Sequence, residues 1–156
     1  MTDITPARPL PALLLQVKNV AIQKLYERLG ELGFGDIREG HGCVFGFIDI
    51  EHGSRLTDLA EASGLTKQAV GEAVTELERL GYLKREACPD DRRAKIIELT
   101  DRGREACLTG RGFFAQLEQE WADELGADLV SGLRAAAEAI VDHEGAPAAQ
   151  LPTPVA

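Results

Sequence analysis

The sequence predicts a mainly α-helical chain with a winged helix-turn-helix, a two-stranded β wing and long helices at both ends. Three observations support this fold class. Within residues 56–70, the small Ala60, the turn-forming Gly64 and the apolar Val70 have the spacing of two helices that cross steeply around a tight turn. A hairpin rich in basic residues follows directly. Apolar residues recur at helical spacing near both ends of the chain.

The composition excludes several classes of protein. With 156 residues, 44% of them hydrophobic and 28% charged, the chain suits one ordinary globular domain. The 5% of aromatic residues argues against a single-strand binder that stacks bases. No stretch approaches the roughly 20 apolar residues of a membrane span, and the first residues lack the features of a signal peptide. We therefore expect a cytoplasmic protein without a membrane partner.

The N-terminal part is predicted to be a long helix followed by a loop. Residues 1–11 contain three prolines and are expected to form a flexible arm, and residues 12–35 form an amphipathic helix that opens near Pro11. Four glycines within residues 33–42 predict a loop. The apolar segment 43–50 fits a buried strand or a buried helix; we expect a helix, because a winged helix-turn-helix needs a supporting helix upstream. The stripe of the first helix comprises Leu14, Val17, Ala21, Leu25, Leu29 and Leu32.

Residues 40–100 are predicted to be the winged helix-turn-helix domain. Thr57 is a good N-cap for a short helix through Ser63, and Thr66 is a good N-cap for a second helix that ends at Gly81. The inner face of the second helix is expected to comprise Ala69, Val70, Ala73, Val74, Leu77 and Leu80. Two strands are then predicted at residues 83–87 and 95–99, joined by a turn rich in proline and aspartate.

The C-terminal part is predicted to be helical. Thr100 is expected to cap a helix that runs to about Glu124, and a last helix follows, whereas residues 145–156 are expected to be disordered. Because one winged domain cannot cover apolar stripes at both ends, we expect residues 12–35 and 101–142 to be dimerisation helices that bury one another across a two-fold axis. Packing within a single chain is the alternative. The stripe of the last helix comprises Leu125, Leu129, Leu133, Ala136 and Ile140.

Charge is unevenly distributed along the chain, whose net charge is −9. Residues 1–65 carry 6 basic and 9 acidic side chains, a net of −3. Residues 66–104 carry 9 and 8, a net of +1, and residues 105–156 carry 2 and 9, a net of −7. Since salt screens charges beyond about 8–10 Å, a basic face can act despite a distant acidic one. This distribution predicts a DNA-binding face in the middle of the chain and binding that depends strongly on salt.

The second helix of the motif is predicted to enter the major groove of double-stranded DNA with its N-terminal turn. Gln68 can pair with adenine, and Lys67 with guanine or a phosphate. Glu72 is unusual on such a face, because a carboxylate repels phosphate; it accepts from a cytosine amino group, pairs with Lys67, or faces away. A solvated helix face is the alternative interpretation. The predicted DNA contacts of this helix are Thr66, Lys67, Gln68, Gly71 and Thr75.

On the wing, the predicted DNA-binding residues are Asp91, Arg92, Arg93 and Lys95. An arginine on a thin hairpin can enter the minor groove, where negative potential is concentrated. We expect Asp91 to hold the Arg93 guanidinium in one orientation. A charged turn without a partner is the alternative.

These residues resemble the MarR family of bacterial transcriptional regulators. The resemblance covers roughly residues 40–106 and is carried by Leu-Thr-Asp-Leu-Ala-Glu, Gly-Leu-Thr-Lys-Gln-Ala-Val, Asp-Asp-Arg-Arg-Ala-Lys and Leu-Thr-Asp-Arg-Gly. It implies a homodimer, usually a repressor, that binds a palindromic operator with Arg93 as a minor-groove finger. It also implies that a small aromatic or amphipathic effector releases the DNA. Two positions depart from the family pattern: Glu72, where a basic residue is common, and Cys88, where the wing usually has Asp or Asn.

Histidine and cysteine residues suggest further sites. His41 follows a glycine-rich loop and is a candidate effector-binding residue. The spacing of His41, Cys43 and His52 matches no zinc pattern, and no nucleophile–base arrangement is present, so we expect no metal, no cofactor and no enzyme activity. The three cysteines, Cys43, Cys88 and Cys107, are too widely spaced for a disulfide framework and indicate reduced thiols.

Two alternatives to an effector-released regulator stay open. Cys88 is expected to lie beside the cations Lys84, Arg85 and Arg92, an environment that favours a reactive thiolate and hence an oxidant sensor; an incidental small residue is the plainer interpretation. A redox- or metal-responsive regulator of the same fold is thus one alternative. The other is a winged-helix protein-interaction module, which the acidic charge favours.

Overall fold

The computed structural model describes residues 8–145. Most of the predicted N-terminal arm and nearly all of the predicted disordered tail (145–156) lie outside the described residues. Helix α1 begins at Leu10, so the end of the predicted arm (residues 1–11) is helical. The elements are α1 (Leu10–Glu31), the 3-10 helix η1 (Glu39–His41), α2 (Gly42–Phe45), β1 (Ser54–Arg55), α3 (Leu56–Ser63), α4 (Lys67–Arg79), β2 (Leu83–Ala87), β3 (Lys95–Leu99), α5 (Asp101–Leu125) and α6 (Ala127–His143).

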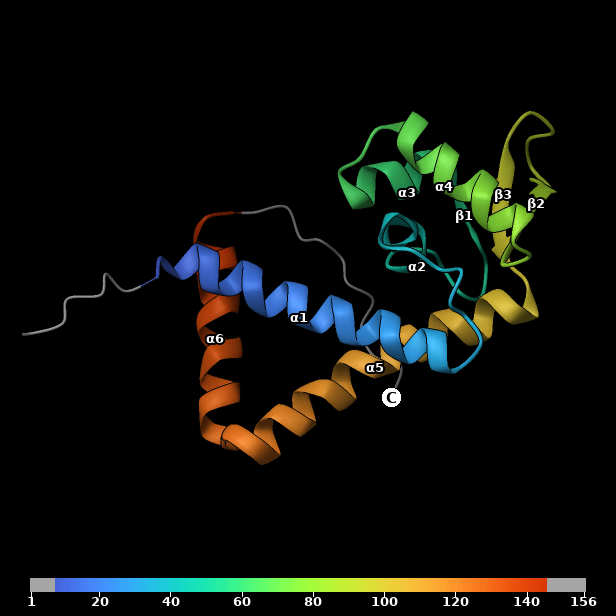
Figure 1. Cartoon of the computed structure of the whole chain (residues 1–156). Coiled ribbons are helices and arrows are strands. Elements are labelled where there is room, and N and C mark those ends of the chain that lie inside the picture. Colours follow the sequence, from blue (N-terminus) through green and yellow to red (C-terminus); the bar gives the residue numbers. More distant parts are fainter. Residues whose placement is uncertain (1–7, 146–156) are drawn as a thin grey trace, which may run out of the picture.

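The winged domain contains α2, α3, α4 and a small antiparallel sheet (Figure 1). Strands β2 and β3 have the predicted bounds and pair with Leu83 opposite Leu99. The sequence analysis missed β1, which pairs with the other edge of β3 and places Ser54 opposite Ile97. The wing therefore extends from a three-stranded sheet of order β1-β3-β2. A strand of two residues is too short to show the alternation by which strands are recognised.

Local capping sets the ends of the main helices. The Thr66 hydroxyl accepts a hydrogen bond from the Ala69 N–H at the start of α4, over 3.2 Å. The Thr100 hydroxyl does the same for Gly103 at the start of α5, over 3.1 Å. Both are the N-caps that the sequence predicts. Gly64 ends α3 with φ +69°, a left-handed conformation that opens the tight turn toward α4.

Three local predictions were wrong. Thr57 does not cap α3, because the helix begins at Leu56 with Arg55 at the N-cap, directly after the pairing of β1 with β3. The segment 43–50 is helical only to Phe45. Ala69 is exposed, because the buried positions of α4 follow its other face. Those buried positions are Val70, Ala73, Val74 and Leu77.

The core lies between the winged domain and the adjoining parts of α1 and α5. Tyr82 and Leu77 are fully buried there, and Cys107 of α5 is 2% exposed. The predicted stripe of α1 divides into two parts. Leu25 and Leu29 pack into this core, whereas Leu14 and Val17, nearer the N-terminus, are exposed. Leu32, which follows the end of the helix, is exposed as well. The described residues of the chain therefore leave Leu14 and Val17 uncovered.

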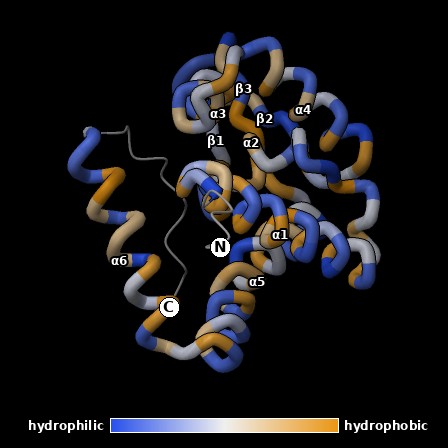
Figure 2. The backbone as a smooth tube through the Cα atoms, turned by 60° about the vertical axis from the view of Figure 1, so that its left-hand side comes forward, coloured by the Kyte–Doolittle hydropathy of each residue, from blue (hydrophilic) through white to orange (hydrophobic). Residues whose placement is uncertain are grey.

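Helix α6 lies apart from the winged domain, at the far end of α5 (Figure 1). Gly126 separates α5 from α6, with φ +108°. No residue of α6 is buried, and apolar residues recur along it (Figure 2). Leu129, for example, is 66% exposed. Within residues 8–145, no helix is long and apolar enough to cross a membrane.

Candidate nucleic-acid interface

The outer face of α4 forms a shallow hollow, here called the α4 hollow. It is lined by residues of α4 and by one residue of the neighbouring strand β2. The wing projects from the same end of the molecule as α4, opposite α6 (Figure 1). The lining residues are Gln68, Gly71, Glu72, Thr75, Glu76, Arg79 and Arg85.

Three of the predicted α4 contacts, Gln68, Gly71 and Thr75, lie in this hollow. Gln68 donates from Nε2 to Oε1 of Glu72, one turn further along, over 3.3 Å. Glu72 thus pairs with Gln68, an interpretation that the sequence analysis did not include. Gly71 has open space on its outer side, because a Cβ there would meet only Leu56 Cδ2 at 3.9 Å. The remaining two predicted contacts are at the start of α4, where Thr66 is the cap and Lys67 is exposed.

Arg85 also lines the α4 hollow, although the sequence analysis did not place it among the candidate DNA contacts. It is on β2, and its Nη2 donates to the Thr75 hydroxyl over 3.0 Å. That hydroxyl in turn donates to the Gly71 carbonyl over 2.9 Å, so Thr75 positions Arg85 rather than presenting a free hydroxyl. Arg85 also pairs with Glu78 over 3.5 Å. Contacts between a strand and a helix ten residues apart leave no periodic signal in the sequence.

The tip of the wing is held by its backbone. The Asp91 carboxylate accepts a hydrogen bond from the Arg93 main-chain N–H over 2.9 Å, and the Ala94 N–H donates to the Asp91 carbonyl over 3.0 Å. The expectation that Asp91 holds the Arg93 guanidinium was therefore wrong: an aspartate two residues before a turn N–H closes a local turn instead.

The wing cations face solvent. Arg92, Arg93 and Lys95 are exposed, and within residues 8–145 no carboxylate lies within 4.0 Å of their charged groups. Lys84 differs, since it pairs with Glu98 over 2.9 Å. The hydrogen bond and the charge of Glu98 raise the pKa of Lys84. The wing thus presents three cations without an ion-pair partner among residues 8–145, an arrangement suited to phosphate.

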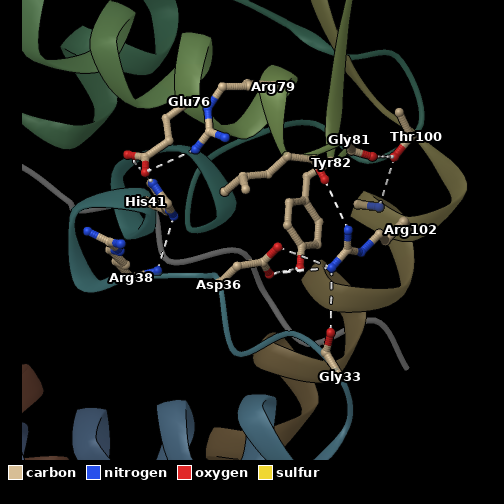
Figure 3. Close-up of polar contacts among 12 residues, drawn as sticks. Gly33, Asp36, Arg38, His41, Glu76, Arg79, Gly81, Tyr82, Thr100 and Arg102 are labelled. Carbon is tan, nitrogen blue, oxygen red and sulfur yellow. Dashed lines mark hydrogen bonds and ion pairs between the residues drawn. The ribbon is translucent and has the colours of Figure 1, made fainter.

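His41, the last residue of η1, connects η1 to α4 (Figure 3). The side chain is 2% exposed, and its Nδ1 accepts from the Arg38 main-chain N–H over 3.1 Å. The proton is therefore on Nε2, which donates to Glu76 over 3.0 Å. This hydrogen bond is the main cause that lowers the pKa of Glu76. In this conformation His41, our candidate effector residue, offers a ligand no free ring nitrogen.

Arg102 connects three segments at the start of α5 (Figure 3). Its guanidinium lies over the Tyr82 ring at 4.3 Å from the centroid and donates to the Leu80 carbonyl over 3.0 Å. It also pairs with Asp36 over 3.2 Å. The Tyr82 hydroxyl donates to the same carboxylate. Burial, together with this hydrogen bond, raises the pKa of Tyr82 to about 12.

The cysteines do not form an exposed site. Cys88 is buried, and Nη2 of Arg55 donates to its Sγ over 3.8 Å. Burial raises the pKa of Cys43 and of Cys107. Within residues 8–145, no three His, Cys, Asp or Glu side chains gather as a metal ion would require.

The tight turn between α3 and α4, the small sheet and its projecting hairpin define a winged helix-turn-helix protein. Residues 36–94 match the sequence profile of the MarR family. This segment, which contains the helix-turn-helix and the first strand of the wing, is similar in sequence to the MarR family.

Solved structures of this class share the fold. The reduced form of MarR from E. coli is 23% identical with a TM-score of 0.73, over 88% of this chain and 99% of that one. The complex of S. aureus MepR with DNA is 22% identical with a TM-score of 0.69, over 87% and 98%. A further MarR family transcription regulator is 16% identical with a TM-score of 0.70, over 86% and 85%. No curated protein matches the chain by sequence.

Proposed function

We propose that this protein is a homodimeric transcriptional regulator that binds double-stranded DNA in the cytoplasm, a repressor that a small aromatic or amphipathic effector releases. One observation carries the proposal: Arg92, Arg93 and Lys95 of the wing are exposed and have no ion-pair partner among residues 8–145. The wing lies at the same end of the molecule as α4 (Figure 1). A helix and a neighbouring hairpin of this kind suit adjacent major and minor grooves. The solved structure of MepR, which has the same fold, contains DNA and supports DNA as the partner.

The self-association of the proposal rests on the exposed apolar faces. The N-terminal part of α1 exposes Leu14 and Val17, and α6 exposes Leu129 and Leu133. A second copy that covers both helices would remove this apolar area from water. It would also set two α4 helices at a fixed spacing, which is the geometry that a palindromic operator requires.

Binding to genomic DNA fragments at low and physiological salt tests the proposal. The native chain should retain specific fragments, and Arg93→Ala should weaken the retention at least tenfold, because one guanidinium in a narrow minor groove is lost. Arg28→Ala removes a cation from α1, far along the chain from the wing, and serves as the matched control. A native chain that retains no fragment at low salt would refute the proposal.

A further inference from the structure

The outer side of α4 has three acidic residues, and two of them are neutralised within the chain. Glu76 accepts from His41 over 3.0 Å and lies 4.0 Å from Arg79. Glu78 pairs with Arg85 over 3.5 Å. Within residues 8–145, Glu72 has no cation within 4.0 Å, and its hydrogen bond comes from the neutral amide of Gln68.

The position of Glu72 places its negative charge on the face of α4 that is proposed to contact DNA. Glu72 lines the middle of the α4 hollow, between Gln68 one turn before it and Glu76 one turn after it. Its neighbour Gly71 has no side chain to shield it. If α4 enters the major groove, the carboxylate faces base edges, and a partner that accepts hydrogen bonds would be repelled.

The bases differ sharply as partners for such a group. Guanine presents the acceptors N7 and O6 to the major groove, and thymine presents the acceptor O4. Adenine presents an amino group beside the acceptor N7. Cytosine presents only its N4 amino group, a donor, so it is the base edge that a carboxylate accepts from without facing an acceptor.

We infer that Glu72, oriented by Gln68, selects a cytosine in each half of the operator; this inference rests on the proposed function. Gln68 gives one of its amide protons to Glu72 over 3.3 Å, which holds the carboxylate on the outer side of the helix. The second amide proton and the carbonyl oxygen of Gln68 stay available. Glu72 is thus a specificity-determining residue, in a position where the resemblance leads one to expect a cation.

Selection from a pool of duplexes with a randomised centre tests this inference. The native chain, Glu72→Gln and Glu72→Ala are each used to select duplexes, which are then sequenced. Glu105→Gln, which removes one negative charge from an exposed position of α5, is the matched control for net charge. Thermal melting and sedimentation of each variant establish that it is folded and associates as the native chain does.

We expect the native chain to select cytosine at one fixed position in each half-site. Glu72→Gln should replace cytosine by adenine there and lower the affinity for the native site about tenfold, and Glu72→Ala should abolish the preference at that position alone. Glu105→Gln should leave every position unchanged. If Glu72→Gln keeps the native base preferences and only tightens binding to all duplexes, Glu72 acts through its charge alone and the inference is overturned. A native chain that selects a site without a cytosine preference also overturns it while leaving the proposed function intact, whereas a native chain that selects no duplex overturns both.

Discussion

His41 Nε2 donates to Glu76 Oε2 over 3.0 Å, which joins the end of η1 to the side of α4. The histidine is 2% exposed, whereas the side chain of Glu76 is 38% exposed, so this hydrogen bond lies at the edge of the interior. The orientation of α4 therefore depends on a contact between residues 35 positions apart.

Replacement of His41 by leucine keeps an apolar body of similar size but removes both hydrogen bonds. The Arg38 N–H and the Glu76 carboxylate then lose their partner. We expect the free energy of unfolding in urea to fall by about 1–3 kcal/mol. Glu76→Gln keeps an acceptor for Nε2 and should cost less. Equal stability of His41→Leu and the native chain would show that this contact contributes nothing.

Asp36 should make stability depend on pH in the acidic range. Burial opposes its ionisation, but the hydrogen bond from Tyr82 and the charge of Arg102 together lower its pKa below the ordinary 3.8. The folded state thus binds this proton less readily than the unfolded state, so the stability is present above about pH 4 and is lost as the pH falls through the folded pKa. Asp36→Asn should destabilise the protein at pH 7, and the difference from the native chain should shrink toward pH 3. Asp142→Asn, on exposed α6, is the control; a gap that stays constant from pH 7 to pH 3 would contradict the assignment.

Two glycines of α5 should respond oppositely to replacement by alanine. At Gly103 the new methyl group would overlap the Tyr82 carbonyl, whereas at Gly112 it would meet nothing within 4 Å. Gly103→Ala should therefore lower the free energy of unfolding by about 1–3 kcal/mol. Gly112→Ala should raise it by up to about 1 kcal/mol, because alanine favours helix. Urea titration of both variants checks the pair, and equal effects would disprove the close contact at Gly103.

Arg85→Ala should weaken DNA binding even though the residue lies outside the predicted recognition helix. Arg85 lines the α4 hollow and is held there by Thr75. If it contacts a phosphate, its loss should reduce by about one the slope of log affinity against log salt. Arg28→Ala should leave the slope unchanged. An Arg85→Ala chain with the native slope would remove Arg85 from the interface.

Leu129→Glu should separate the proposed dimer. Leu129 is 66% exposed on α6, and a charge in its place would be buried without a partner in each copy. We expect the dissociation constant from sedimentation equilibrium to rise about a hundredfold or more. Ser131→Glu adds the same charge to the same helix two residues away and should have a smaller effect. If both variants sediment as the native chain does, α6 is not the interface.

The parts of this fold that could be predicted are those with local causes. The hydroxyls of Thr66 and Thr100 each accept a hydrogen bond from the N–H three residues later, and Gly64 forms a turn. Each of these features can be recognised from a few neighbouring residues. The hairpin was predicted with the bounds of both strands. By contrast, β1 has only two residues, and its pairing with β3 joins segments more than 40 residues apart.

The parts of the candidate interface that could not be predicted depend on tertiary contacts. The roles of Arg85 and Glu76 follow from Thr75 and His41, which lie on other elements. Asp91 was assigned to the wrong donor of Arg93, because spacing alone does not distinguish a main-chain N–H from a guanidinium. The sequence predicts the uneven distribution of charge along the chain. The fold determines which carboxylates form ion pairs.

Helix α5 begins at the end of β3 and continues unbroken for 25 residues until it reaches α6. At about 1.5 Å per residue it is a rod of roughly 37 Å. A tilt of about 5° at one end of such a rod moves the other end by roughly 3 Å, close to the rise of one DNA base pair. Small changes in the packing of two copies against each other would therefore shift the winged domains by about one base pair along the duplex. The winged domain itself would not need to change conformation.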